Sequence, residues 1–284
     1  MIQSPVEDTI KTLATEKLLE LEKYIKGDVI SFYGPIISGF ASHMKAIIQD
    51  LHDKKDTLFF ILTTGGGSAT EVERTVTVFR NFYNKVNFIV PDYAYSAGTI
   101  LCMSGDEIYM DYFSVLGPID PQIPNKDKNL VPAQGYLDKV NEFVEKSRNG
   151  IITDAEMIML NKLDLADIRA YEQDKVLTVD LLVKWLVKYK FKPWEKHSDG
   201  REVTNAEKNE TARCIAEKLG DNNIWKSHGR GINIETLREE LRLKVIDFGA
   251  DEKLSDLLKD YYQFIMDYIG KYQYPHFTHT RRYM

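Results

Sequence analysis

This 284-residue chain has few cysteines, no long apolar run and no region rich in positive charge. Its two cysteines, Cys102 and Cys214, lie far apart and belong to no Cys-x-x-Cys or Cys/His cluster, which favours a reduced, intracellular protein. No stretch approaches the roughly 18 uncharged apolar residues of a membrane-spanning helix, and residues 1–27 lack the apolar block of a signal peptide. We therefore expect a cytoplasmic protein without a membrane span.

The charge balance and the missing phosphate motifs exclude further classes of protein. The net charge is −6, and the basic pair Arg281-Arg282 is too short to predict binding to nucleic acid or acidic lipid. The sequence contains neither a P-loop nor a Gly-x-Gly-x-x-Gly motif, and it has no cluster of metal-binding residues. It therefore predicts no nucleotide, metal or other cofactor.

Hydrophobic periodicity divides the chain into three predicted regions. Residues 1–27 are expected to form an amphipathic helix, because apolar residues recur at helical spacing over 6–26. In residues 28–150, short apolar strands alternate with amphipathic helices, as in a catalytic core. Residues 151–284 are expected to be mostly helical, with a loop at 192–201.

Within residues 28–150 the order of elements is β-α-β-α-β-α-β. This order indicates an α/β fold with a mostly parallel sheet and right-handed crossovers. In such folds the catalytic loops lie at the carboxyl ends of the strands. The predicted strands are 28–33, 57–63, 86–90, 107–110 and 114–116, and the predicted helices are 40–51, 69–79 and 97–103.

Two turns at predicted strand ends hold the candidate catalytic groups. Gly65, Gly66 and Gly67 follow one apolar strand, and Ser96 follows the next. A serine at a strand-to-helix turn can attack a carbonyl once a base removes its proton. Backbone N–H groups in a glycine-rich turn can stabilise the oxyanion that results. Together the two turns favour acyl transfer, most simply hydrolysis of a peptide bond.

Each turn taken alone has a simpler explanation. A Gly-Gly-Gly run is often only a tight connection or a phosphate cradle, and Ser-Ala-Gly is often a close contact between packed helices. The two turns occur in order, however, and each follows an apolar strand. That combination favours the catalytic interpretation.

Three segments resemble the Clp-protease/crotonase superfamily: Gly65–Gly67, Tyr95–Gly98 and Ser114–Gln122. Within it the chain most resembles the serine dehydrogenase proteinase family, which is related to signal peptide peptidase A and to the Clp proteolytic subunit. The resemblance implies a ClpP/crotonase-like ββα superhelix with a helical C-terminal extension. It also implies a serine endopeptidase that acts on peptides or unfolded proteins and assembles as a homo-oligomer.

The resemblance assigns roles to individual residues. Ser96 matches the nucleophile of the family, and Gly67 and Ala97 match the backbone donors of its oxyanion hole. The substrate backbone is expected to lie against the remaining residues of the first turn. These are Gly65, Gly66 and Ser68.

The general base is the part of the site that departs from the Clp pattern. The Clp proteolytic subunit has a catalytic histidine about where this chain has Asp120, and no histidine occurs between His52 and His197. The signal-peptide-peptidase branch uses a Ser-Lys dyad, with its lysine on a helix after the core, and Lys139 matches that position. Lys139 and Phe143 share a helix face, which would favour the partly desolvated, neutral amine that a base must be.

Other interpretations of the base remain open. Lys139 is an ordinary solvated lysine in the simplest alternative, and Lys146, further along the same face, is the reserve candidate. Asp120 fits a structural turn residue, although it could orient a base. His228 fits a loop or subunit-interface residue, although folding could bring it to Ser96.

Two other functions compete with the peptidase. A crotonase-like acyl-CoA hydratase or isomerase would combine oxyanion amides with a glutamate base, and Glu71 and Glu73 are the carboxylates that follow the glycines. Both glutamates fit the exposed side of a helix. In the third interpretation the protein is a non-catalytic oligomeric scaffold that kept the fold and lost the activity.

Overall fold

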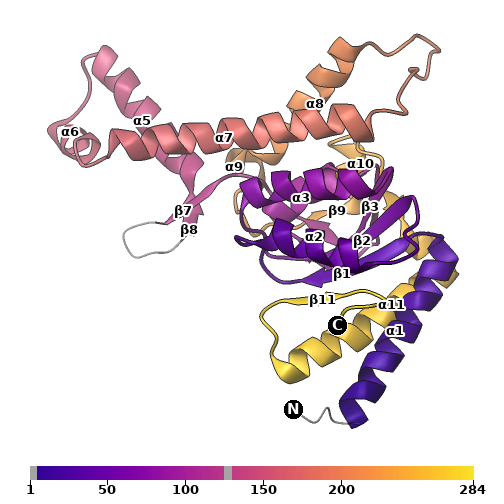
Figure 1. Ribbon diagram of the computed structural model, residues 1–284. Helices are drawn as coiled ribbons and strands as arrows, with labels where there is room; N and C mark the ends of the chain where they lie inside the picture. The colour runs from indigo at the N-terminus through magenta and orange to yellow at the C-terminus, as the bar shows by residue number, and fades with distance from the viewer. Residues whose placement is uncertain (1–4, 125–129) are drawn as a thin grey trace.

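The computed structural model describes residues 5–124 and 130–284 as a mixed α/β structure (Figure 1). At its centre is a six-stranded sheet with the order β10-β5-β3-β2-β1-β11. Neighbouring strands are parallel except β11, which pairs antiparallel with β1. The α/β class and the mostly parallel sheet are therefore confirmed. The strands are β1 (Asp28–Tyr33), β2 (Thr57–Thr63), β3 (Lys85–Ile89), β5 (Glu107–Met110), β10 (Ile246–Asp247) and β11 (Phe277–His279).

The central strand β2 explains why helices cover both faces of this sheet. Leu58, Phe60 and Leu62 point into one apolar cluster, whereas Phe59 and Ile61 point into another, and all five are buried. The first cluster is closed by α2, α3 and α4, and the second by α1 and α11, which lie side by side on the opposite face in Figure 1. The bounds are α1 (Pro5–Ile25), α2 (Phe40–Asp50), α3 (Ala69–Phe82), α4 (Ala97–Met103) and α11 (Glu252–Tyr272).

A second, smaller sheet continues from the carboxyl end of β2. It has the order β4-β6-β9, with β4 parallel to β6 and β6 antiparallel to β9. A backbone bridge between Thr64 and Ala94 connects it to the large sheet. The strands are β4 (Tyr93–Ala94), β6 (Val115–Leu116) and β9 (Ile232–Asn233). This sheet positions the candidate site.

A helical arm projects from the body after β6. In Figure 1, α5 and α6 stand away from the sheets, and α7 runs back from them across the top of α3. Among the described residues, no helix is long and apolar enough to cross a bilayer. The arm consists of the hairpin β7 (Gln122–Pro124) and β8 (Leu130–Pro132), followed by α5 (Ala133–Arg148), α6 (Asp154–Leu160) and α7 (Leu165–Trp185).

The C-terminal region is mostly helical, as expected, but it also adds strands that were not predicted. β9, β10 and β11 come from it and extend both sheets. These strands are two or three residues long, too short for an alternating pattern to reveal them. The division into regions at residues 27 and 150 stays a prediction. The remaining helices are the π-helix η1 (Leu186–Lys190), α8 (Asn205–Leu219), α9 (Asn222–Trp225), α10 (Ile234–Glu239) and the 3₁₀ helix η2 (Phe248–Ala250).

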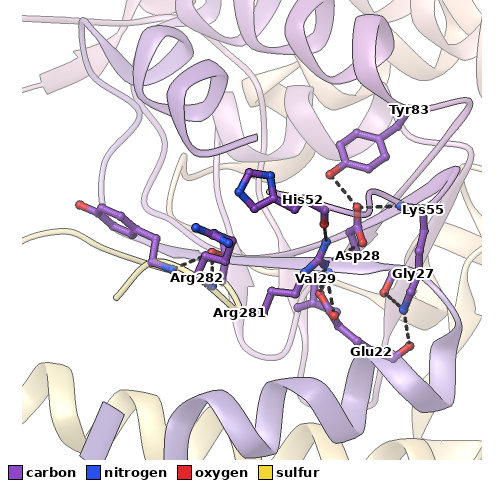
Figure 2. Close-up of polar contacts among 11 residues, drawn as sticks. Glu22, Gly27, Asp28, Val29, His52, Lys55, Tyr83, Arg281 and Arg282 are labelled. Atoms are coloured by element: carbon purple, nitrogen blue, oxygen red, sulfur yellow. Dashed lines mark hydrogen bonds and ion pairs between the residues drawn. The ribbon is translucent and has the colours of Figure 1, made fainter. Parts of the chain in front are cut away.

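The chain end is fixed to the start of β1 by a buried ion cluster, shown in Figure 2. Arg281 Nη1 lies 2.8 Å from Asp28 Oδ1 and 3.0 Å from Glu22 Oε1. Tyr83 donates a hydrogen bond of 3.1 Å to Asp28 Oδ2. Burial raises the pKa of Glu22 although Arg281 opposes that rise. The cluster thus joins α1, β1 and the residues after β11.

Candidate active site

Ser96 occupies a strained turn between β4 and α4. Its φ of 51° and ψ of −116° are unusual for a residue with a side chain, and such conformations cost about 1–3 kcal/mol. The side chain is half-buried, and its Oγ makes no hydrogen bond to a described residue. Strain of this kind is common at functional sites, and Ser96 lines a cavity.

The glycine turn fits closely against Ser96. A Cβ on Gly66 would lie 2.8 Å from Ser96 Cβ, and the φ of Gly66 is 108°. A Cβ on Gly67 would lie 2.1 Å from the carbonyl oxygen of Ile36. Ile36 clamps the turn, because its N–H donates to Gly66 O and its carbonyl accepts from Ser68 N–H. Both positions therefore require glycine.

The two amides expected to form the oxyanion hole are available as donors. Among the described residues, neither Gly67 N–H nor Ala97 N–H donates a hydrogen bond to the protein. Gly67 and Ala97 line the same cavity as Ser96. Free backbone donors beside a serine hydroxyl are the arrangement that stabilises a tetrahedral oxyanion.

The cavity has a volume of about 500 Å³ and holds most of the residues predicted for the site. Gly66 lies behind it, packed against the Ser96 turn. Apolar side chains from three elements form part of the wall, and Asp174 contributes a carboxylate at one side. Predicted residues that line the cavity are Gly65, Gly67, Ser68, Ser96 and Ala97, and the apolar wall includes Ala69, Ile100, Ile119 and Leu177.

The predicted lysines are not brought to Ser96 within one chain. Lys139 lies on α5 with 64% of its side chain exposed, and its Nζ is 2.6 Å from Glu142 Oε2. Lys139 lines a different pocket, which Phe143 also lines. The two residues therefore share a helix face, as the sequence predicted. Lys146 bonds to Glu156 and Glu142, and these contacts raise the pKa of its ammonium, opposite to what a base needs.

The histidine that enters the cavity is His228, which we expected in a loop or an interface. Its Nδ1 lies 2.8 Å from Asp120 Oδ1. The Asp120 side chain is fully buried, and its other oxygen accepts a hydrogen bond of 2.7 Å from Gln122 Nε2. His228 lines the cavity that contains Ser96. The separation of 108 residues between Asp120 and His228 explains why no local pattern linked them.

The glutamates proposed for a crotonase-like reaction have structural roles. Glu71 is buried and accepts a hydrogen bond of 3.0 Å from Ala41 N–H, which lowers the pKa of its carboxyl. It also pairs with Arg74. Glu73 is closer to the surface and pairs with Lys184. Neither glutamate lines the Ser96 cavity.

Comparison with known families agrees with this geometry. The family model described as ClpP-like SDH-type serine proteinase matches residues 37–201. The chain belongs to this family, which confirms both the resemblance and the fold class.

Two curated relatives come from Methanocaldococcus jannaschii. The uncharacterized protein MJ1495 is 40% identical over 203 residues, which cover 72% of this chain and 56% of that protein. The uncharacterized protein MJ0137 is 34% identical over 70 residues, which cover 25% of this chain and 24% of that protein. The chain thus spans about half the length of the first relative and a quarter of the second.

Two solved structures with a similar chain course are variants of the 1510-N membrane-bound stomatin-specific protease. One has 14% identity and a TM-score of 0.45, with 80% of this chain and 82% of that chain covered. The other, in complex with a substrate peptide, has 16% identity and a TM-score of 0.41, with 77% and 72% covered. Similarity this low does not transfer residue roles.

Proposed function

We propose that this protein is a serine endopeptidase that cleaves peptide bonds through an acyl-enzyme on Ser96. Its membership of the ClpP-like SDH-type serine proteinase family supports the reaction class. The observation that carries the proposal is the strained Ser96 turn. Its hydroxyl lies in the same cavity as Gly67 and Ala97, whose backbone N–H groups donate no hydrogen bond to the described residues.

In the proposed reaction, Ser96 Oγ attacks the carbonyl carbon of the scissile bond. The carbonyl oxygen becomes an oxyanion between Gly67 N–H and Ala97 N–H, each of which lowers the barrier by roughly 3 kcal/mol. An extended peptide would lie beside Gly65 and Ser68, which line the cavity. Gly66, also predicted to contact substrate, is instead buried against the Ser96 turn. Peptides and unfolded segments are therefore the substrate class.

A Ser-Lys dyad with Lys139 remains the proposal that comes from the sequence. The exposed ion pair with Glu142 does not supply the dry, neutral amine that a lysine base requires. Replacement of Lys139 by methionine, which keeps the length of the side chain, tests this role. Loss of activity in that variant would support the dyad.

Assembly and location are further parts of the proposal. We propose a homo-oligomer, supported by exposed apolar side chains along the projecting arm. We propose a cytoplasmic location, supported by two cysteines that form no disulfide with each other. The apolar side chains of the arm that are more than half exposed are Ile151, Ile158, Met159, Leu165 and Val176.

The nucleophile is tested by covalent labelling with a fluorophosphonate probe, followed by peptide mapping. We expect one adduct, on Ser96, and loss of both labelling and cleavage of fluorescein-labelled casein in Ser96→Ala. The matched control is Ser198→Ala, because Ser198 is exposed in a loop that does not line the cavity. Casein cleavage by Ser96→Ala at the wild-type rate would contradict the proposed function.

A further inference from the structure

Helix α7 places an acidic side chain in the wall of the Ser96 cavity. It contributes Asp174, Leu177 and Thr178 to that wall, and residues three and four apart lie on one helix face. Among the described residues, Asp174 is the one carboxylate that lines the cavity, and neither a lysine nor an arginine lines it. The cavity of the proposed nucleophile is therefore acidic on its α7 side.

The same face of α7 anchors this helix to the body of the protein. Leu181, Leu182 and Trp185 follow at helical spacing and are buried in the core below α7, which crosses the top of α3 in Figure 1. Thr178 is buried as well. Asp174 comes one turn earlier on this face, where the helix passes from the core to the cavity. A fixed part of the fold thus positions the carboxylate.

The carboxylate of Asp174 has no structural task in the part of the chain that the structure describes. Its oxygens form no hydrogen bond or ion pair there, and only its backbone carbonyl is engaged, accepting from Thr178 Oγ1 at 2.9 Å. The residue lies in the third turn of α7, too far from the first turn to stabilise the helix end, where Asp164 already serves as the N-cap. An exposed carboxylate of this kind is available to a ligand.

The rest of the wall suits a long side chain with a charged end. Ile100, Ile119 and Leu177 are apolar and line the same cavity as Asp174. A lysine or arginine of the substrate could place its methylene groups against them and its cation at the carboxylate. The volume of about 500 Å³ lies in the range of pockets that enclose small ligands, so the cavity has room for one such side chain.

We propose that Asp174 selects substrates that carry a lysine or arginine next to the scissile bond. This inference rests on the proposed function and narrows its substrates from peptides in general to peptides with a basic residue at the cleavage site. Asp174 determines specificity and takes no part in the bond-breaking steps. An apolar substrate residue would cover the carboxylate without supplying a cation, whereas a basic residue pairs with it as water leaves. That difference favours the basic substrate.

The cleavage sites of the wild-type protein give the first test. After a short incubation with casein, mass spectrometry of the fragments identifies the residues on both sides of each cleaved bond. We expect lysine or arginine on one side of most of these bonds. Cleavage sites without an excess of basic residues would contradict the proposal.

Matched peptides give the second test. Three internally quenched peptides, built on the strongest casein site, differ only at the selected residue, which is lysine, norleucine or glutamate. Norleucine keeps the methylene chain of lysine and lacks its charge. Because a hydrogen bond to a charged group is worth about 10–100-fold in an equilibrium, kcat/KM of the wild type should be higher by that factor for the lysine peptide than for the norleucine peptide.

Two substitutions of Asp174 should change this preference. In Asp174→Asn the ratio of kcat/KM for the lysine peptide to that for the norleucine peptide should fall by about 10–100-fold. Asp174→Lys should cleave the glutamate peptide faster than the lysine peptide. The matched control is Asp180→Asn, because Asp180 is also exposed on α7 but lines a different pocket. It loses the same charge and should keep the wild-type ratio.

A structural effect of the substitutions is recognised with a probe that has no basic group. Labelling of Ser96 by an alkyl fluorophosphonate should fall far less in Asp174→Asn than cleavage of the lysine peptide does. Equal losses for labelling and for all three peptides would mean that Asp174 supports the site as a whole, which overturns its role in specificity. Thermal unfolding shows whether each variant is folded.

The outcomes separate this inference from the proposed function. If Asp174→Asn keeps the wild-type preference for lysine, or if the wild type shows no such preference, Asp174 does not select the substrate and the peptidase stands. If Ser96→Ala cleaves the same peptides at the wild-type rate, the proposed function itself fails.

Discussion

At the scale of single residues, the site depends on positions where a side chain must be absent. Gly66 and Gly98 both lie in closely packed contacts around Ser96. A Cβ on Gly98 would lie 2.4 Å from Thr64 Cγ2, so the Ser-Ala-Gly turn needs its glycine for packing as well as for chemistry. Gly98 thus packs against Thr64 and Ala94 at the ends of strands and not against a second helix, and the catalytic role of the turn stays a prediction.

Gly66→Ala should inactivate the enzyme while leaving it folded. The new methyl group would push against Ser96 at a φ that alanine rarely adopts, which would displace the proposed nucleophile from the amides proposed as oxyanion donors. We expect a loss of about 10²–10³-fold in kcat/KM, similar to the loss of an oxyanion donor. Gly135→Ala is the control, because its Cβ meets nothing within 4 Å. Equal activities of the two variants would count against the assigned geometry.

At the scale of elements, the last residues of the sequence are joined to the first strand of the sheet. β11 adds an antiparallel strand to β1, and the residues that follow it carry Arg281 into the cluster of Figure 2. Asp28 is fully buried there, and Glu22 is 5% exposed. Two carboxylates in such a place require their cation.

Arg281→Met should reduce the free energy of unfolding by about 3–5 kcal/mol, because it leaves Glu22 and Asp28 buried without a counterion. The neighbouring Arg282 supplies the control, since it pairs at 3.3 Å with an exposed Asp50. Arg282→Met should cost less than about 1 kcal/mol. Urea unfolding measures both. A similar small loss in the two variants would mean that the cluster contributes little.

At the scale of the whole molecule, the arm leaves apolar surface without a cover in the single chain. Ile158 is 57% exposed and Leu165 is 82% exposed. Both lie at the far end of the arm, around α6 and the start of α7, away from the two sheets (Figure 1). Exposed apolar side chains gathered on a projecting element favour contact with another copy of the chain.

The double variant Ile158→Asp, Leu165→Asp should lower the mass measured by light scattering, because buried charge opposes the interface. Val6→Asp is the control, since Val6 is 64% exposed on α1, outside the arm. We expect Val6→Asp to retain the wild-type mass. A monomeric wild-type protein, or a double variant of unchanged mass, would overturn the role of the arm in assembly.

Local sequence determined the elements that carry Ser96, the proposed nucleophile. The relevant signals each extend over only a few residues: the apolar run 57–63, the triple glycine and the Ser96 turn. Hydrophobic periodicity and the backbone freedom of glycine therefore predicted the strand, the turn and their order from the sequence. Membership of the family follows from the same segments. The structure added the strain at Ser96 and the free amides to this prediction.

Tertiary structure alone decided which polar side chains line the cavity together with Ser96. Lys139 was chosen from sequence by its position on a helix, but the arm takes α5 away from the cavity and leaves the lysine exposed. His228 and Asp120 are 108 residues apart in the sequence. They are brought together by the pairing of β6 with β9, which is only two residues long. So short a pairing leaves no periodic pattern, because its stability comes from packing of the surrounding loops and not from local preference.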